Sequence, residues 1–155
     1  MAGEALAKAD PVNAPQYRAN VIRTVRELNA LRTEVGKRVF GLQGRNYVVF
    51  HDAFQHFEER FGLPALGAVR LGDARMPGAR RLAALRKTIV DRKVVCVFSE
   101  PQFEPRLVRT LIAGTGARSG MLDPLGADLE PGPGLYSKLL RRNAAAFEAC
   151  LRPAG

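Results

Sequence analysis

The sequence predicts an α/β fold, in which a four-stranded, mostly parallel sheet is flanked by helices and preceded by one long helix. Short apolar runs rich in β-branched and aromatic residues alternate with longer segments of helical periodicity, which is the pattern of parallel βαβ units. At 155 residues the chain is long enough for one domain with a sizeable hydrophobic core. No apolar run approaches the roughly 20 residues that a membrane-spanning helix requires.

The first 40 residues are predicted to be helical. Residues 1–12 indicate a short helical segment, and Asn13 with Gln16 three positions later matches a capping box that would begin a long helix over residues 13–40. A stripe of apolar side chains at spacings of three and four runs along this helix: Tyr17, Val21, Val25, Leu28, Leu31, Val35 and Val39. At 1.5 Å per residue such a helix is roughly 38 Å long, which is typical of a helix that spans two lobes.

Residues 41–155 are predicted to form an α/β lobe. Four runs read as strands: 46–50, 65–71, 94–98 and 118–122. Four segments between and after them have helical periodicity: 53–61, 79–91, 105–113 and 135–151. The Pro/Gly-rich stretch before the last helix indicates a loop.

Three acidic or imidazole side chains come directly after predicted strands. His51 follows the first strand, Glu100 the third and Asp123 the fourth. Because ligands bind at the carboxyl edge of open parallel sheets, we expect these groups to face one crevice, where a histidine and carboxylates suit a divalent transition metal. The sequence leaves three alternatives open: a structural role for His51, an Asx-turn at Asp123, and a loop-orienting role for Glu100. His56 is expected on a helix surface.

The composition admits other classes of function. A formal net charge of +9 and a pI near 10.4 suggest a basic module for nucleic acid or another polyanion. The arginines, however, are scattered over polar helical positions, and no nucleic-acid-reading motif accompanies them, so no nucleic acid is expected. The motifs GxxxxGK, GxSxG and HExxH are absent from the sequence, and we do not expect an enzyme. A lobe without any metal function is a further alternative.

The two cysteines, Cys96 and Cys150, allow two interpretations. A disulfide bond would tie a central strand to the last helix and close a loop of about 55 residues, which the chain-entropy model values at roughly 4 kcal/mol. It would also imply an oxidising compartment. Two inert, buried thiols are equally compatible with the apolar surroundings of both residues.

Several segments in order resemble a known family: YVVFHDAFQHFEERFGL, PGARRLAALRKTI, CVFSEPQF, GMLDPLGADL and YSKLLRRNAAAFEACL. Together they resemble the C-terminal lobe of the zinc-specific solute-binding proteins of ABC uptake transporters, the ZnuA type within the TroA-like group. The resemblance implies two α/β lobes joined by one long rigid helix, with zinc bound between the lobes. It also implies delivery of zinc to a membrane permease, a periplasmic location, and an export signal upstream of this chain.

Carried over residue by residue, the resemblance assigns His51 to the metal-binding histidine of the C-terminal lobe and Asp123 to an aspartate that is a further ligand in some members. Glu100 is not part of this assignment, and its position after a strand alone makes it a candidate to contact a ligand rather than the metal. Cys96 and Cys150 match a disulfide of zinc-type members, whereas manganese-type relatives have a carboxylate where His51 stands.

The family's N-terminal lobe, with its further histidines, is absent from this sequence. The chain therefore resembles a C-terminal fragment, for which we expect weak zinc binding or none. We also expect self-association through the exposed stripe of the long helix.

Overall fold

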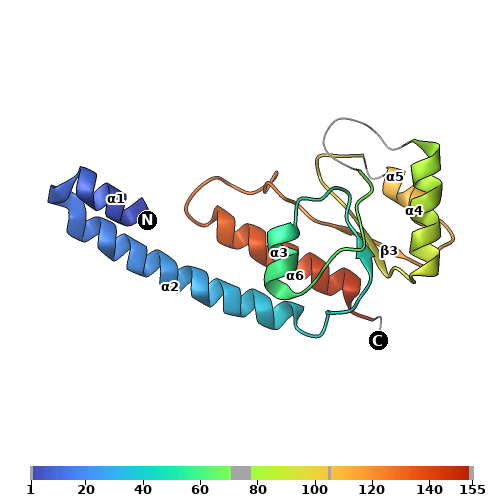
Figure 1. Ribbon diagram of the computed structural model, residues 1–155, viewed down its shortest axis with the longest axis horizontal. Coiled ribbons are helices and arrows are strands. Elements are labelled where there is room, and N and C mark those ends of the chain that lie inside the picture. The colour runs from blue at the N-terminus through green and yellow to red at the C-terminus, as the bar shows by residue number, and fades with distance from the viewer. Residues whose placement is uncertain (1, 71–77, 105, 154–155) are drawn as a thin grey trace. The chain divides into compact units, whose positions relative to one another are not determined.

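The computed structural model describes residues 2–70, 78–104 and 106–153 (Figure 1). The chain divides into two compact units, Met1–Lys37 and Arg38–Gly155. The last residue of the predicted 65–71 strand and the first of the predicted 105–113 helix lie outside the described residues.

The first unit is helical, as predicted. It contains α1 (Ala2–Ala9), the short 3-10 helix η1 (Pro11–Asn13) and most of the long helix α2 (Ala14–Val39). Helix α1 folds back along the beginning of α2 (Figure 1), and the two approach so closely at Gly3 that a Cβ atom there would lie 2.2 Å from Val21 Cγ2. Exposed side chains continue the contact through an ion pair between Arg18 and Glu4 at 3.0 Å.

The predicted capping box at the start of α2 is wrong. The Asn13 side chain ends η1 and donates to Asp10 Oδ2 at 2.8 Å, while the Gln16 amide donates to Asn20 Oδ1 at 3.0 Å. Tyr17 donates its hydroxyl to the same Asp10 carboxylate at 3.0 Å. Asp10, rather than Asn13, is therefore the side chain that accepts hydrogen bonds at the junction between η1 and α2.

The sheet of the second unit is parallel throughout, as predicted. Its described strands are β1 (Tyr47–Val48), β2 (Cys96–Ser99) and β3 (Arg118–Met121), in the order β1-β2-β3. Tyr47 pairs with Cys96, and Cys96 pairs with Arg118. The described part of the chain therefore has three strands rather than the predicted four.

The missing fourth strand is the segment predicted at 65–71. This segment does lie beside β1, and the N–H groups of Val69 and Arg70 donate to the carbonyls of Val49 and Phe50 at 2.9 and 2.8 Å. Successive N–H groups of a regular strand point to opposite sides, so two consecutive donors to one neighbour show that the strand alternation is lost. What is left is a single parallel bridge between Val49 and Ala68.

The predicted helices of the second unit are confirmed. They are α3 (Gln55–Phe61), α4 (Ala79–Asp91), α5 (Arg106–Ile112) and α6 (Leu135–Leu151), and α4 and α6 match their predicted ranges residue for residue. On α6, Phe147 and Leu151 are buried, whereas Tyr136 is 53% exposed.

Strands β1 and β2 are buried on both faces, between which successive strand residues alternate, whereas β3 at the edge of the described sheet is largely exposed. On one face Val48 and Val97 belong to a cluster with residues of α4 and α5: Leu85, Ile89, Val108 and Leu111. On the other face the rings of Tyr47 and Phe98 make edge contacts with Phe147 of α6, at centroid distances of 5.4 and 5.0 Å. Figure 1 shows α6 on one side of the sheet and α4 with α5 on the other. Because helices lie on both sides of the sheet, the ends of the strands are the part of the sheet where a ligand can bind.

Candidate metal centre at the carboxyl edge of the sheet

His51 lies at the carboxyl edge of the sheet, directly opposite Glu100. The register that pairs Tyr47 with Cys96 sets His51, four residues later, level with Glu100, four residues after Cys96. The backbone N–H of His51 donates to Glu100 Oε1 at 3.2 Å, and the ring nitrogen Nδ1 lies 3.1 Å from Oε1 and 3.3 Å from Oε2. The imidazole is 28% exposed. The His51 side chain therefore lies at the boundary between the protein interior and solvent.

Glu100 is a buried carboxyl group, with only 2% of its surface exposed. Burial raises its pKa, because the charged form is poorly solvated, while the hydrogen bonds and charge of His51 act in the opposite direction. The nearby charge of Asp123 adds to the rise. Glu100 is thus the partner of the partly exposed imidazole and is itself shielded from solvent.

Asp123 is also buried, but its surroundings favour the anion. Its Oδ1 atom accepts hydrogen bonds from the N–H groups of Leu125 and Gly126, both at 2.9 Å, and Oδ2 accepts one from Ala127 at 2.7 Å. Burial alone would raise the pKa of Asp123, but these backbone donors outweigh it and lower the pKa. The geometry is that of an Asx-turn, one of the alternatives that the sequence left open.

Two polar residues that the sequence reasoning missed support Asp123. Asn143, buried on α6, accepts from the Asp123 N–H at 3.0 Å and donates to the Asp123 carbonyl at 2.7 Å. Gln102, in the loop after β2, donates to Asp123 Oδ1 at 3.2 Å. The available signal was Asn143 itself, a polar residue four positions from both Leu139 and Phe147 on the buried face of a helix.

The structure thus joins His51 directly to Glu100, and it places Asp123 at the same edge, where its charge acts on Glu100. Across the described ranges, no group of three or more His, Cys, Asp or Glu side chains could hold a metal ion. These residues alone therefore do not complete a four-coordinate site. His56 is exposed on α3, as expected.

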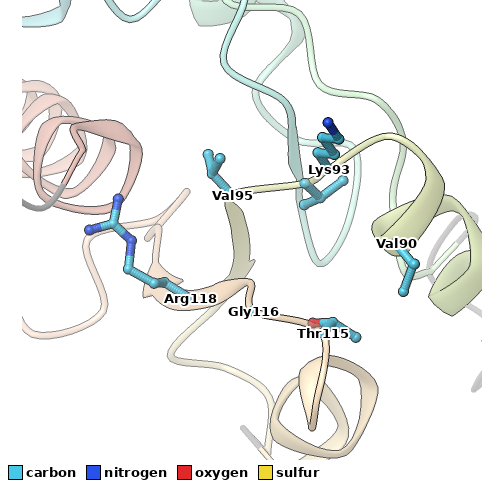
Figure 2. Close-up of a pocket in the computed structure, with 7 residues that line it drawn as sticks. Val90, Lys93, Val95, Thr115, Gly116 and Arg118 are labelled. Atoms are coloured by element: carbon cyan, nitrogen blue, oxygen red, sulfur yellow. The ribbon is translucent and has the colours of Figure 1, made fainter.

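A shallow pocket lies at the other end of the sheet, where β2 and β3 begin (Figure 2). It has a volume of about 430 Å³ and is lined by Val90, Lys93, Val94, Val95, Thr115, Gly116 and Arg118. Figure 2 shows Arg118 extending towards α6, where its guanidinium donates to the carbonyls of Cys150 and Arg152. The charge of Arg118 therefore serves the carboxyl end of α6, which favours a structural role over anion binding.

The two cysteines form a disulfide bond. Cys96 of β2 and Cys150 of α6 are joined, with 5.9 Å between their Cα atoms. The bond lies on the same face of the sheet as the Tyr47, Phe98 and Phe147 rings. Of the two interpretations that the sequence allowed, the structure shows the cross-link.

Comparison with solved structures defines the class of protein. The chain is similar to a crystal structure of ZnuA, with a TM-score of 0.80 and 29% identity over 97% of this chain and 53% of that chain. It is also similar to the crystal structure of a ZnuA deletion mutant with zinc bound, with a TM-score of 0.78 and 28% identity over 99% of this chain and 55% of that one. The chain has the fold of about half of a ZnuA-type solute-binding protein.

Sequence comparison identifies the family. The family model described as "ZnuA: Zinc-uptake complex component A periplasmic" matches residues 2–150, and the chain belongs to this family. High-affinity zinc uptake system protein ZnuA of Brucella abortus (strain 2308) is 44% identical over 94% of this chain and 44% of its own length. The protein of that name from Paracoccus denitrificans (strain Pd 1222) is 42% identical over 96% of this chain and 46% of its own. The chain spans about half the length of the curated relatives it matches.

No helix in the described ranges combines the length and the apolar character needed to cross a bilayer.

Proposed function

We propose that this chain is the C-terminal, zinc-binding lobe of a periplasmic solute-binding protein that captures Zn²⁺ and delivers it to the permease of an ABC uptake transporter. His51 donates a neutral imidazole nitrogen to the ion, and Asp123 contributes an oxygen. The observation that carries the proposal is the His51 ring, held at the carboxyl edge of the sheet by buried Glu100 in a member of the ZnuA family.

The ligand chemistry supports zinc over harder cations. Imidazole nitrogen is a common zinc ligand, whereas carboxylate and carbonyl oxygens suit manganese or magnesium. A similar protein of this family has been crystallised with zinc bound. Two ligands fall short of the four that zinc usually takes, so the remaining ligands would come from a second lobe of the intact protein. On its own, this chain is expected to bind zinc weakly.

Asp123 supports the proposal in a different way from His51. Its lowered pKa keeps the carboxylate ionised, as a metal ligand must be. Oδ1 accepts three hydrogen bonds, but Oδ2 accepts one, from Ala127. A carboxylate oxygen has two lone-pair positions, which favours Oδ2 as the atom for coordination.

The disulfide supports a role in an oxidising compartment such as the periplasm, because such bonds persist there and are rare in the cytosol. The role is capture and hand-over rather than catalysis. Self-association stays a prediction. The stripe on α2 that would mediate it includes Val21, Val25 and Leu28, which are 42%, 52% and 43% exposed.

The two histidines of the chain provide a matched test. In titration calorimetry with ZnCl₂, His51→Ala is expected to lose most of the zinc affinity of the chain, because it removes the only imidazole at the sheet edge. His56→Ala removes an exposed imidazole on α3 and is expected to bind zinc as the unmodified chain does. Circular dichroism of both variants verifies that they are folded.

The proposal fails if His51→Ala binds zinc with undiminished affinity. It also fails if His56→Ala and His51→Ala lose equal amounts, because binding would then be a property of any surface histidine.

A further inference from the structure

We propose that Asn143 of α6 is a positioning residue, which fixes the backbone of Asp123 and thereby holds its carboxylate in place for zinc. The inference deepens the proposed function and rests on it for the role of Asp123 as a ligand. The positioning itself concerns the metal-free chain, so it can be measured without zinc.

Asp123 is the first residue beyond the hydrogen bonds of the sheet. The N–H of Leu122 donates to the carbonyl of Ser99 in β2 at 2.9 Å. Successive N–H groups of an extended chain point to opposite sides, so the N–H of Asp123 points away from β2. Because β3 is the edge strand in the described part of the sheet, no described strand accepts that N–H. Asp123 is 2% exposed, so its backbone groups need a partner other than water.

A single side chain is that partner. Asn143 Oδ1 accepts from the Asp123 N–H at 3.0 Å, and Nδ2 donates to the Asp123 carbonyl at 2.7 Å. The reverse orientation of the amide would set two donors against each other and two acceptors against each other, so these contacts admit only one orientation. Asn143 is itself 4% exposed, and water therefore competes poorly for either bond.

The two hydrogen bonds restrain both backbone dihedrals of Asp123. The N–H belongs to the planar peptide group that precedes the residue, and the carbonyl belongs to the one that follows it. Pro124 adds to the restraint, because a residue before proline is biased towards extended conformations. The direction of the Asp123 side chain from its Cα atom is therefore set by contact with α6.

This restraint connects the carboxylate to the rest of the sheet. The N–H groups of residues 125–127 donate to the carboxylate and hold it within its own turn. Asn143 attaches that turn to α6. One helical turn further, Phe147 packs against aromatic rings of β1 and β2. The carboxylate is thus placed relative to the two strands that precede His51 and Glu100.

Loss of such support has a defined consequence for metal binding. Groups that hydrogen-bond a ligating residue typically change metal affinity by 10- to 100-fold when they are removed. A ligand that is already ordered loses less conformational freedom when the ion arrives. The hydrogen bonds of Asn143 go to the backbone of Asp123, so the effect is on the order of the ligand rather than on its charge.

Three variants separate positioning from general stability. Asn143→Ala removes both hydrogen bonds to Asp123. Leu151→Ala is the matched control, because Leu151 is a buried residue about two turns further along the same helix, and its truncation destabilises the core without removing either bond. Asp123→Asn removes the charge of the ligand while it leaves the backbone of residue 123 available to Asn143.

The first measurement is hydrogen exchange by NMR on the unmodified, metal-free chain. The side-chain NH₂ of Asn143 is expected to exchange with water at least about 10-fold more slowly than that of Asn29, which is exposed on α2. Equal exchange of the two would overturn the proposal, and this comparison needs no variant to fold.

The second measurement asks whether the turn depends on Asn143. In Asn143→Ala, the N–H groups of residues 125–127 are expected to exchange at least about 10-fold faster relative to Val97 in β2. In Leu151→Ala, exchange at both places is expected to increase by the same factor, because only the overall stability falls. An unchanged ratio in Asn143→Ala would overturn the proposal.

Titration calorimetry with ZnCl₂ tests the role in binding. We expect zinc affinity to fall 10- to 100-fold in Asn143→Ala and to match that of the unmodified chain in Leu151→Ala. When Asp123→Asn is already present, Asn143→Ala is expected to cause no further loss, because Asn143 acts through Asp123. Provided that Asp123→Asn weakens binding, an undiminished affinity of Asn143→Ala would overturn the proposal, and so would a further loss in the double variant.

Failure of the proposed function gives a different result. In that case Asp123→Asn binds zinc as the unmodified chain does, whereas the exchange of residues 125–127 still depends on Asn143. Asn143 would then position the turn, and the role of Asp123 as a zinc ligand would fall.

Discussion

Reduction of the disulfide between Cys96 and Cys150 is expected to lower the free energy of unfolding by about 4 kcal/mol. The two cysteines are 54 positions apart in the sequence, so the bond closes a loop that includes β2, α5, β3 and α6. In the chain-entropy model, a loop of about 55 residues removes roughly 14 cal/mol/K from the unfolded chain, which is about 4 kcal/mol at 25 °C. For a unit of this size the melting temperature should fall by roughly 15 °C.

The assay is urea unfolding followed by circular dichroism, with and without reductant. Because both sulfur atoms are buried, the reduced sample is prepared by unfolding in reductant and then refolding in its presence. The double variant Cys96→Ala/Cys150→Ala is the control, since its stability should not respond to reductant. Comparing two redox states of one sequence leaves the side-chain packing otherwise unchanged.

A loss of less than about 1 kcal/mol on reduction would refute the loop-closure argument, because the unfolded chain would then already be restricted without the bond. A loss near the expected value would mean that the lobe is substantially weaker in a reducing compartment. That result would connect the cross-link to the proposed periplasmic location.

Two further predictions concern the core and the acid at the sheet edge. Phe147→Ala removes a buried ring that contacts three other aromatic rings and should cost about 3–5 kcal/mol by calorimetry, whereas Tyr136→Ala, at an exposed position of the same helix, should change stability by less than about 0.5 kcal/mol. The pKa of Asp123 is lower in the folded state, so its contribution to stability is present above the unfolded pKa of about 3.9 and is lost as the pH falls through the folded value. Urea unfolding between about pH 2 and 6 should therefore show a shallower pH dependence for Asp123→Asn, and an unchanged dependence would contradict the assignment.

Hydrophobic periodicity was sufficient to predict the fold class and the helices. Helices α4 and α6 were located residue for residue because their apolar spacing is regular and each is bounded by Gly, Pro or polar residues. The segment predicted as a strand at 65–71 has the composition of a strand and lies beside β1. Its consecutive N–H groups, however, do not alternate in direction as those of a regular strand do. Composition indicates which residues prefer a sheet. The alternation of hydrogen bonds along a strand depends instead on the path of the chain after β1, and no sequence pattern predicts that path.

The candidate site was predicted in outline from strand ends alone. His51 and Glu100 were expected at one edge because both follow parallel strands, and the structure places them in direct contact. That contact depends on the register between β1 and β2, to which residues almost 50 positions apart contribute. The Asx-turn of Asp123 was foreseen as an alternative, but its support by Asn143 was not, because the pairing requires α6 to be docked on the sheet.

Helix α6 connects the cross-link to the candidate site. Asn143 and Cys150 lie about two turns apart on the buried face of α6. Asn143 hydrogen-bonds to the backbone N–H and carbonyl of Asp123, and Cys150 is joined to Cys96 of β2. The helix is thus attached to the sheet at two points, one at the strand that carries Glu100 and one at the turn that carries Asp123. A rigid helix between these points transfers the position of β2 to the Asp123 turn. The geometry between the acid and the His51–Glu100 pair therefore depends on helix docking, and a bond remote from the sheet edge helps to maintain it.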